Sequence, residues 1–399
     1  MTTTGISQQQ RRLIIFILGL LSAVNPLSMD MYLPAFEQIA HALGTTVASL
    51  SFTVSSYFVG IGVGQIIYGP LLDRFGRKKP LYFGLSLYIV ASIGSLFSHH
   101  LWHLLLWRFI SAAGGCVASV MSMAMVRDLF EEKERARIFS FLMLVLGISP
   151  LLAPTVGSFA AMHIGWYGSF LILIFLVGMM MLLARWILPE SHGGDLSVEL
   201  TPSSIARDYG VVAREAPFLS YAVIGGASFA SLFAFIAASP LLLFTFFKVS
   251  IYGYGLLFTA LAAGYISGSQ VSLWLLRRRS SKQVLRLAVR MQIGSTLLLL
   301  LLTALSWISL PIVFCLLFLM LLAVGCAAPN AAGLAIAPFA ANAGRASALY
   351  STVQILLGTM ASLSIGFLDI KTIFPIACVF ALPALIAELL LILREHCSS

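Results

Sequence analysis

The sequence predicts an all-α polytopic membrane protein with twelve transmembrane helices arranged as two pseudo-symmetric six-helix bundles. Of its 399 residues, 60% are hydrophobic and only 10% are charged, whereas soluble globular chains carry about 25% charged residues. Apolar runs of about 20 residues recur along the chain, which is the length that an α-helix needs to cross a bilayer. A transmembrane β-barrel would instead show alternating segments of about ten residues.

The apolar runs define the predicted spans and the two halves of the chain. A polar stretch at 189–216 separates an N-terminal bundle, 1–188, from a C-terminal bundle, 217–399. Within this stretch, Thr201 and Pro202 are typical of a helix N-cap and first turn. We expect either a short helix on the cytoplasmic surface or a plain linker there. The predicted spans are residues 13–35, 48–71, 80–98, 101–126, 137–161, 166–188, 217–245, 251–276, 283–306, 309–333, 344–368 and 372–393.

The positions of the basic residues predict the orientation of the chain. The net charge of +9 would by itself also suit a nucleic-acid partner. However, all but Lys248, Lys371 and Arg108 of the 24 basic residues fall in segments that are cytoplasmic if the N-terminus is cytoplasmic. Cytoplasmic loops of membrane proteins carry such an excess of Lys and Arg. We therefore expect both termini in the cytoplasm and no nucleic-acid partner.

The two halves share a faint repeat. Residues 69–80, GPLLDRFGRKKP, follow the second span, and residues 268–282, GSQVSLWLLRRRSSK, follow the eighth. Both copies begin with a glycine at a helix end and finish in a basic cluster, but Ser272 stands where the first copy has Asp73. Two six-helix halves with weak internal symmetry are typical of secondary transporters, whose substrate site lies between the halves near the middle of the bilayer.

The first copy of the repeat resembles the loop motif of the major facilitator superfamily. That motif is a glycine, three residues, an aspartate, a basic residue, any residue, a glycine, an arginine and further basic residues. It is filled here by Gly69, Asp73, Arg74, Gly76, Arg77 and Lys78. The resemblance runs the length of the chain and implies the twelve-helix fold of that superfamily. It also implies that Asp73, Arg77 and an acid after the fourth span, here Asp128, form a charge cluster that stabilises the closed cytoplasmic side.

Three further segments resemble the Bcr/CflA-type drug-resistance subfamily of proton-coupled exporters. They are DMYLPAF at 30–36, VRDLF at 126–130 and SPLLAPTVGS at 149–158. The last is similar to the antiporter motif Gly-Pro-x-x-Gly-Gly through Pro154 and Gly157, with Pro150 one turn earlier. It has Ala153 and Ser158 where the motif has glycines. We expect these residues either to act in antiport or only to tune helix packing, in which small residues allow close approach.

An acid and an arginine lie inside the apolar spans of the first half. Asp30 lies about 9 Å inside the outer end of the first span, and Arg108 about 10 Å inside that of the fourth, at 1.5 Å per residue. An ionised acid this deep costs about 2.5–3.5 kcal/mol on insertion scales. Burial favours its neutral form and a nearby arginine favours its charged form, so we expect the two groups to be electrostatically coupled.

These two residues are the candidate proton-coupling site. Asp30 can take a proton from one side of the membrane and release it to the other if a cavity opens alternately. A structural pair, or a hydrated Asp30 near the surface, would also fit the sequence. The family resemblance implies that Arg108 assists proton exchange, although Ser111 and Ala112 stand where the family has Gln and Gly.

Other polar or soft side chains in the spans either line the substrate cavity or simply pack between helices. These weaker candidates are Asn25, Tyr32, Tyr57, Gln65, Met123, Tyr221, Phe235, Asn330 and Gln354. Three histidines, His99, His100 and His103, crowd the second outer loop. A metal site or a pH sensor is an alternative to a solvated loop there, and we favour the loop because the sequence shows no fourth ligand.

We therefore expect a proton-coupled secondary transporter that exports drugs or other amphipathic small molecules by alternating access. The alternative is a narrow-specificity transporter of a metabolite or siderophore on the same scaffold. The chain contains no GxxxxGK phosphate-binding pattern and no catalytic cluster, so we expect neither an ATP-driven pump nor an enzyme. The expected coupling ion is the proton, with no cofactor or metal. The expected setting is a monomer in the bacterial cytoplasmic (inner) membrane, with the bilayer and a small-molecule substrate as its partners.

Overall fold

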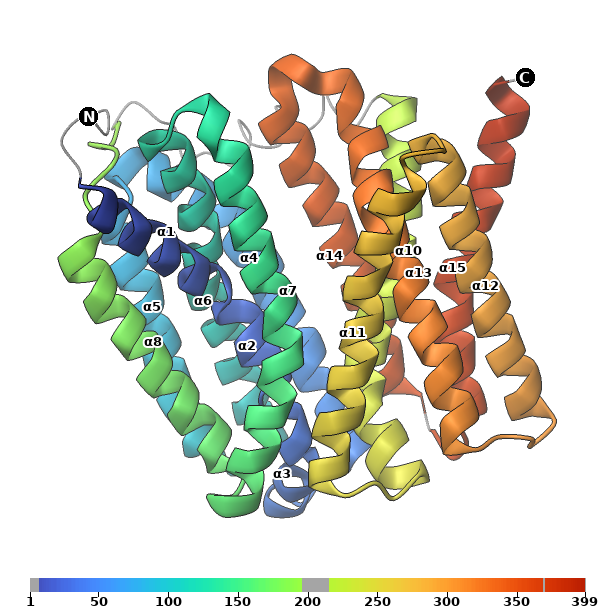
Figure 1. Ribbon diagram of the computed structural model, residues 1–399. Coiled ribbons are helices and arrows are strands. Elements are labelled where there is room, and N and C mark those ends of the chain that lie inside the picture. The colour runs from blue at the N-terminus through green and yellow to red at the C-terminus, as the bar shows by residue number, and fades with distance from the viewer. Residues whose placement is uncertain (1–6, 196–214, 369, 399) are drawn as a thin grey trace. The chain divides into compact units, whose positions relative to one another are not determined.

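The computed structural model describes residues 7–195, 215–368 and 370–398, which form helices joined by short connections (Figure 1). Within these ranges, twelve helical segments are long and apolar enough to cross a membrane. The predicted fold class and number of spans are therefore confirmed. The surface helix expected after Thr201 lies outside the described residues, and the division of the chain at 189–216 stays a prediction.

The chain groups into two compact units by its internal contacts. The first unit holds residues 1–45 and 56–200, and the second holds residues 46–55 and 201–399. Helix α4 therefore begins in the second unit and continues in the first.

The first unit contains the helices of the first six spans. The first span is broken into short pieces, whereas the next five are long helices, coloured blue to green in Figure 1. The bounds are α1 Gln8–Ser22, α2 Val24–Asp30, the 3₁₀ turn η1 Leu33–Ala35, α3 Phe36–Ala42, α4 Val47–Phe75, α5 Lys78–Leu96, α6 Leu101–Leu129, α7 Glu132–His163 and α8 Tyr167–Ile187.

The second unit contains the helices of the last six spans, coloured yellow-green to red in Figure 1. Its first helix continues into a π-helical turn. The bounds are α10 Ala216–Pro240, the π-helical turn η2 Leu241–Phe246, α11 Ile251–Leu275, α12 Ser281–Ala304, α13 Leu310–Ile336, the 3₁₀ turn η3 Ala337–Asn342, α14 Ala343–Phe367 and α15 Phe374–Ser398.

The break in the first span follows from its sequence. Pro34 has no N–H, so it cannot donate the hydrogen bond that a continuous helix needs at this position. The next N–H, of Ala35, bonds the Tyr32 carbonyl at 3.0 Å and forms a 3₁₀ turn. Helix α2 consequently ends at Asp30. The predicted continuous span 13–35 is thus a discontinuous helix, and the acid lies at the break.

Two turns show how local sequence sets the helix ends. Between α4 and α5, Gly76 has φ +84°, a left-handed conformation that glycine adopts without steric cost. In the second unit, Ser280 and Gln283 form a capping box at the start of α12, in which each side chain accepts from the other residue's backbone N–H. The first turn places the residues of the loop motif between α4 and α5, and the second begins the helix that follows the basic cluster.

Each unit packs around an apolar core of its own. In the first unit, Leu18, Leu85 and Val117 are among the fully buried members. In the second, Phe218 and Val289 are among them. Because lipid tails are as apolar as these side chains, van der Waals packing between helices rather than exclusion of water stabilises the two cores. In the first unit, charged side chains are buried within this apolar framework, and they form the candidate site.

Candidate functional site

Arg108 is buried in the first unit and is held by α2. Its side chain extends from α6 and is 1% exposed. One guanidinium nitrogen, Nη2, donates to the Ser28 carbonyl at 3.1 Å, and Nη1 donates to the Ser28 hydroxyl at 3.3 Å. The rings of Tyr32 and Tyr57 each lie 4.1 Å from the guanidinium carbon. A carbonyl dipole and two aromatic rings therefore stabilise this cation, since aromatic faces attract positive charge.

Further hydrogen bonds connect the neighbours of Arg108. Tyr88 of α5 donates its hydroxyl to the Ser28 hydroxyl oxygen at 2.8 Å, and Tyr57 of α4 donates to the Asn25 side-chain oxygen at 3.0 Å. Ser28 thus connects its own helix, α2, to α5 and α6. We call Asn25, Ser28, Tyr32, Tyr57, Tyr88 and Arg108 the arginine cluster. It fixes α2 against α4, α5 and α6, with Asp30 two residues beyond its central serine.

Asp30 is buried beside the arginine cluster without a partner for one of its oxygens. The residue is 2% exposed, and its Oδ1 makes no hydrogen bond within the described part of the chain. Among the described residues, no ion pair within 4 Å joins Asp30 to Arg108, whose two terminal nitrogens bond Ser28 instead. The two predicted coupling residues are therefore connected only through α2, which carries Asp30 and whose Ser28 binds Arg108.

A second charged group, which we call the loop cluster, lies where α4 meets α5. Arg77 donates from Nη1 to Asp73 at 2.7 Å and from Nε to Asp128 at 2.8 Å. A third bond runs from Nη2 to Asp128 at 3.3 Å. Burial acts to lower the pKa of Arg77, but the bonds to Asp128 and Asp73 outweigh it and raise that pKa above its usual range. The guanidinium is thus charged and bridges two carboxylates, as the family resemblance implies.

The other members of the loop motif have smaller roles in this cluster. Arg74 lies over the adjacent ring of Phe75, with 5.8 Å from its guanidinium carbon to the ring centre. Gly69 has open space around it, so a side chain there would meet nothing within 4 Å. A Cβ at Gly76 would approach the His192 carbonyl to 2.8 Å, so its positive φ and its small size are both required.

The sequence reasoning missed the segment that follows α8, residues 188–195, which covers the loop cluster. Glu190 accepts from the backbone N–H groups of Arg77 at 2.8 Å and Lys78 at 3.0 Å, and so caps the start of α5. Ser191 donates to Asp128 at 2.8 Å. The signal was an acid directly after Pro189, five residues beyond Arg185 at the end of the span.

The residues of the antiporter-like segment lie in α7. Pro154 and Gly157 are buried, and Pro150 is partly buried. Gly157 packs directly on the backbone of Met31, so tightly that a Cβ there would collide with the Met31 carbonyl. The glycine of this segment therefore touches the broken span next to Asp30.

The weaker cavity candidates are dispersed. In the first unit, Gln65 and Met123 are partly buried. In the second unit, the Asn330 amide nitrogen donates to Ser272 at 2.6 Å, and Gln354 donates to the Tyr350 hydroxyl at 3.3 Å.

Two aromatic candidates of the second unit are accounted for by packing contacts. Tyr221 lies under Arg394, 3.6 Å from its guanidinium carbon to the ring centre. Phe235 packs on Phe258, with ring centres 5.3 Å apart. These contacts explain their burial without a ligand.

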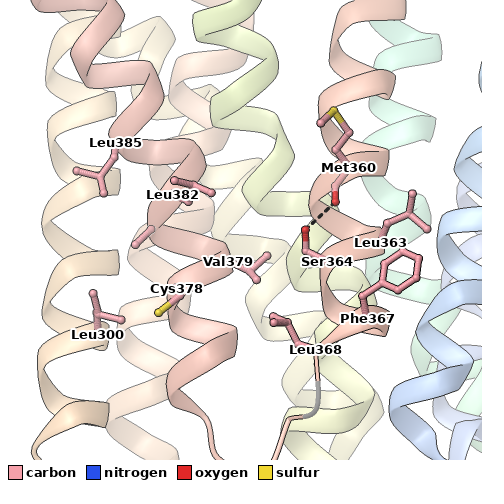
Figure 2. Close-up of a pocket in the computed structure, with 11 residues that line it drawn as sticks. Leu300, Met360, Leu363, Ser364, Phe367, Leu368, Cys378, Val379, Leu382 and Leu385 are labelled. Atoms are coloured by element: carbon pink, nitrogen blue, oxygen red, sulfur yellow. Dashed lines mark hydrogen bonds between the residues drawn. The ribbon is translucent and has the colours of Figure 1, made fainter.

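An open apolar groove of about 720 Å³ lies in the second unit between α12, α14 and α15 (Figure 2). Figure 2 shows the hydroxyl of Ser364 turned back to the carbonyl of Met360, which it meets at 2.9 Å. The groove is lined by Leu300, Met360, Leu363, Ser364, Phe367, Leu368, Cys378, Val379, Ala381, Leu382 and Leu385. None of the predicted site residues is in its wall, and it offers no ionisable carboxylate or base to a proton.

The histidines of the second outer loop do not form a metal centre within the described residues. No group of three or more His, Cys, Asp or Glu side chains there could hold a metal ion. His100 and His103 lie near each other, with ring centres 5.5 Å apart. Within the described part of the chain, the candidate functional groups are therefore two: the arginine cluster with Asp30, and the loop cluster.

Comparison with known proteins agrees with this geometry. The model of the Major Facilitator Superfamily matches residues 18–363. The chain is similar to a bicyclomycin resistance protein homolog of Haemophilus influenzae, with 29% identity over 287 residues, 71% of this chain and 72% of the relative. It is also similar to a chloramphenicol resistance protein of Pseudomonas aeruginosa, with 29% identity over 380 residues, 91% of this chain and 86% of the relative.

A solved structure supports the same fold. The crystal structure of a D-xylose–proton symporter matches with a TM-score of 0.74 and 17% identity, and the match covers 94% of this chain and 97% of that one. At this identity the likeness shows the fold alone. The names of the two sequence relatives fit the drug-resistance subfamily that the motifs resemble.

Proposed function

Because the chain belongs to the Major Facilitator Superfamily, we propose that it exports drugs or other amphipathic small molecules in exchange for protons. Transport proceeds by alternating access, and the proton is the coupling ion. The drug-resistance names of two bacterial relatives support the substrate class. The buried Asp30, with an unpartnered carboxyl oxygen, is the observation that carries the proton coupling.

Asp30 has the properties of a proton carrier. An ionised carboxylate without a partner is costly in apolar surroundings, so the neutral, protonated form fits the observed burial. Release of the proton then requires that water or a charge reach the carboxyl group. Alternating access brings water to Asp30 from one side of the membrane and then from the other, so that Asp30 changes its protonation during the cycle.

Arg108 has a supporting role in the proposed cycle. Its charge is balanced by the Ser28 carbonyl and by Tyr32 and Tyr57 rather than by a carboxylate. Arg108 is hydrogen-bonded to Ser28, two residues before Asp30 on α2, so a shift of α2 that brings the two groups closer favours the ionised form of Asp30. Arg108 therefore eases deprotonation of Asp30 without forming a permanent ion pair that would block reprotonation.

The loop cluster biases the conformational equilibrium. Arg77 is buried between Asp73 and Asp128, whose side chains are 57% and 19% exposed. Ion pairs of this exposure contribute from a fraction of 1 kcal/mol to a few kcal/mol. That range is enough to favour one state without locking it, because transport needs both states to be populated.

The proton gradient supplies sufficient energy for this export. One charge crossing 100 mV gains about 2.3 kcal/mol, and each pH unit adds about 1.4 kcal/mol. We place the protein in the cytoplasmic membrane of a bacterium, with both termini in the cytoplasm, as the distribution of basic residues supports. It acts as a monomer on a small-molecule substrate and needs no cofactor.

Purified protein in liposomes tests this function. Radiolabelled chloramphenicol is placed at equal concentration on both sides, a proton gradient directed inward is imposed, and net drug efflux and internal pH are followed together. We expect drug efflux to require the gradient, to acidify the liposome interior, and to stop when a protonophore collapses the gradient. Efflux that ignores the gradient would contradict proton coupling. No flux of chloramphenicol or of a lipophilic cation would instead favour the alternative of a narrow metabolite or siderophore transporter.

A further inference from the structure

The helix break beside Asp30 leaves backbone carbonyls without their usual partners. In a continuous helix, the Asp30 carbonyl would accept from residue 34 and the Met31 carbonyl from residue 35. Pro34 has no N–H, and the Ala35 N–H bonds Tyr32 instead. Buried carbonyls without a partner are unfavourable in a membrane protein, so the break needs support from outside the first span.

Two helices provide that support at one atom, the Met31 carbonyl oxygen. Ser169 of α8 is fully buried and donates its hydroxyl to this oxygen at 3.0 Å. Gly157 of α7 lies against the same carbonyl and leaves no room for a side chain. Ser169 and Gly157, which we call the Met31 clamp, thus converge on the residue that directly follows Asp30.

We propose that Ser169 and Gly157 are positioning residues for proton coupling, because they hold the broken span so that the Asp30 carboxyl stays buried beside the arginine cluster. The functional half of this inference rests on the proposed function. Ser169 acts through Met31 and touches neither the proton nor the substrate. The arginine cluster holds α2 from the side of α4, α5 and α6, and the Met31 clamp holds its end from the side of α7 and α8.

The clamp explains two features of the sequence that the fold alone does not require. The glycine of the antiporter-like segment is needed for close approach to the Met31 backbone, since a Cβ would collide with it. The break leaves the Met31 carbonyl without its helical donor, and Gly157 of α7 has no side chain that could donate to it. A serine in the otherwise apolar start of α8 is therefore needed as the donor.

Hydrogen exchange of the purified protein tests the clamp directly. The variants are Ser169→Ala, Ser169→Thr, which keeps the hydroxyl, and the control Ser122→Ala. Ser122 is also fully buried in the first unit, but its hydroxyl bonds the Ala118 carbonyl of its own helix at 2.7 Å. We expect the amides of residues 31–33, 35 and 36 to exchange about tenfold faster in Ser169→Ala, equivalent to about 1.4 kcal/mol. Ser169→Thr and Ser122→Ala should exchange at the wild-type rate.

Chloramphenicol transport in liposomes tests the consequence for coupling. We expect Ser169→Ala to lower proton-driven flux about tenfold, with chloramphenicol–chloramphenicol exchange at equal pH staying within threefold of wild type. Ser169→Thr should restore the driven flux. Gly157→Ala should lower driven flux in the same way, and the control Gly178→Ala, which has nothing within 4 Å of its added Cβ, should not.

The outcomes separate this inference from the proposed function. Wild-type hydrogen exchange in Ser169→Ala would overturn the clamp, and a parallel fall of driven flux and drug exchange would show a structural defect rather than a positioning role. Asp30→Asn is measured alongside. If it keeps proton-driven flux, or if wild type does not move chloramphenicol, the proposed function fails, while hydrogen exchange still decides whether Ser169 holds the break.

Discussion

The two units bury polar side chains in different ways. The first unit buries charged groups, including Arg108, Arg77 and Asp30, and one Asp30 oxygen has no partner among the described residues. Among the described buried residues of the second unit, the polar side chains are neutral. Gln292 is typical, because it accepts from Ser228 at 2.6 Å and donates to Ser231 at 2.9 Å.

The two copies of the repeated loop differ in the same way. In the first, Arg77 joins Asp73 to Asp128. In the second, Ser272 replaces the acid and accepts a hydrogen bond from Asn330. The groups to which we assign proton coupling and conformational gating thus lie in the first unit. The neutral Ser, Asn and Gln side chains of these bonds in the second unit do not change protonation in the physiological range.

The largest expected difference between the units concerns Arg108. Arg108→Ala removes the cation, leaves the Ser28 carbonyl without its guanidinium donor, and should lower proton-driven transport more than 100-fold, or by about 2.7 kcal/mol or more in activation free energy. Arg108→Lys should retain about a tenth of the activity, because an ammonium cannot match a planar guanidinium between two rings. Transport is measured in liposomes per amount of folded protein. Full activity of Arg108→Lys would show that charge alone suffices.

The loop cluster should give the next largest effect. Arg77→Ala removes three hydrogen bonds and leaves Asp128 bonded to Ser191, so turnover should fall about tenfold, equivalent to about 1.4 kcal/mol. Arg278→Ala in the second copy of the loop is the matched control and should stay within twofold of wild type. Equal losses in the two variants would mean that both loops need only positive charge for correct insertion.

A neutral group of the second unit should affect stability rather than coupling. Gln292→Leu leaves Ser228 and Ser231 without their amide partner and should lower the free energy of unfolding by about 1–3 kcal/mol. Thermal unfolding in detergent measures this loss. Turnover of the protein that remains folded should stay within about threefold. A large loss of proton coupling in Gln292→Leu would contradict the functional separation of the units.

The smallest expected effect comes from the edge of the arginine cluster. Tyr88→Phe removes the hydroxyl that donates to Ser28, but Ser28 keeps both bonds from Arg108. Driven transport should fall only about two- to fivefold, or about 0.4–1 kcal/mol, at the lower end of the net value of one hydrogen bond. The matched change Tyr254→Phe removes a hydroxyl bonded to Ser239 in the second unit and should alter the unfolding temperature without altering the proton-to-drug ratio.

Much of the fold was predictable, because span length and apolar composition are local properties of the sequence. The same holds for the pairing of Arg77 with Asp73 and Asp128, which follows from the loop motif. Pro34 is visible in the sequence as a helix breaker. The sequence does not show that the break leaves the Met31 carbonyl without its helical donor. The donor that replaces it is Ser169, which lies far away in the sequence and carries no local signal.

The partner of Arg108 could not be predicted for a similar reason. Depth along two helices suggested that Arg108 and Asp30 interact, yet depth does not specify the direction in which a side chain extends. The orientation of α2 instead places the Ser28 carbonyl against Arg108. The rings of Tyr32 and Tyr57 lie over the Arg108 guanidinium. Glu190 is visible in the sequence as an acid after Pro189, but nothing in the sequence shows that it accepts from the backbone N–H groups of Arg77 and Lys78.

The most direct test of the central claim counts protons for Asp30→Asn. Chloramphenicol is moved through wild type, Asp30→Asn and the control Asp73→Asn in liposomes of weak buffering capacity, and protons are counted per drug molecule by an internal pH dye. We predict a fixed proton-to-drug ratio in wild type, the same ratio at a lower rate in Asp73→Asn, and no drug-dependent proton movement in Asp30→Asn. An unchanged ratio in Asp30→Asn would contradict the account, because the proton would then be carried by another group.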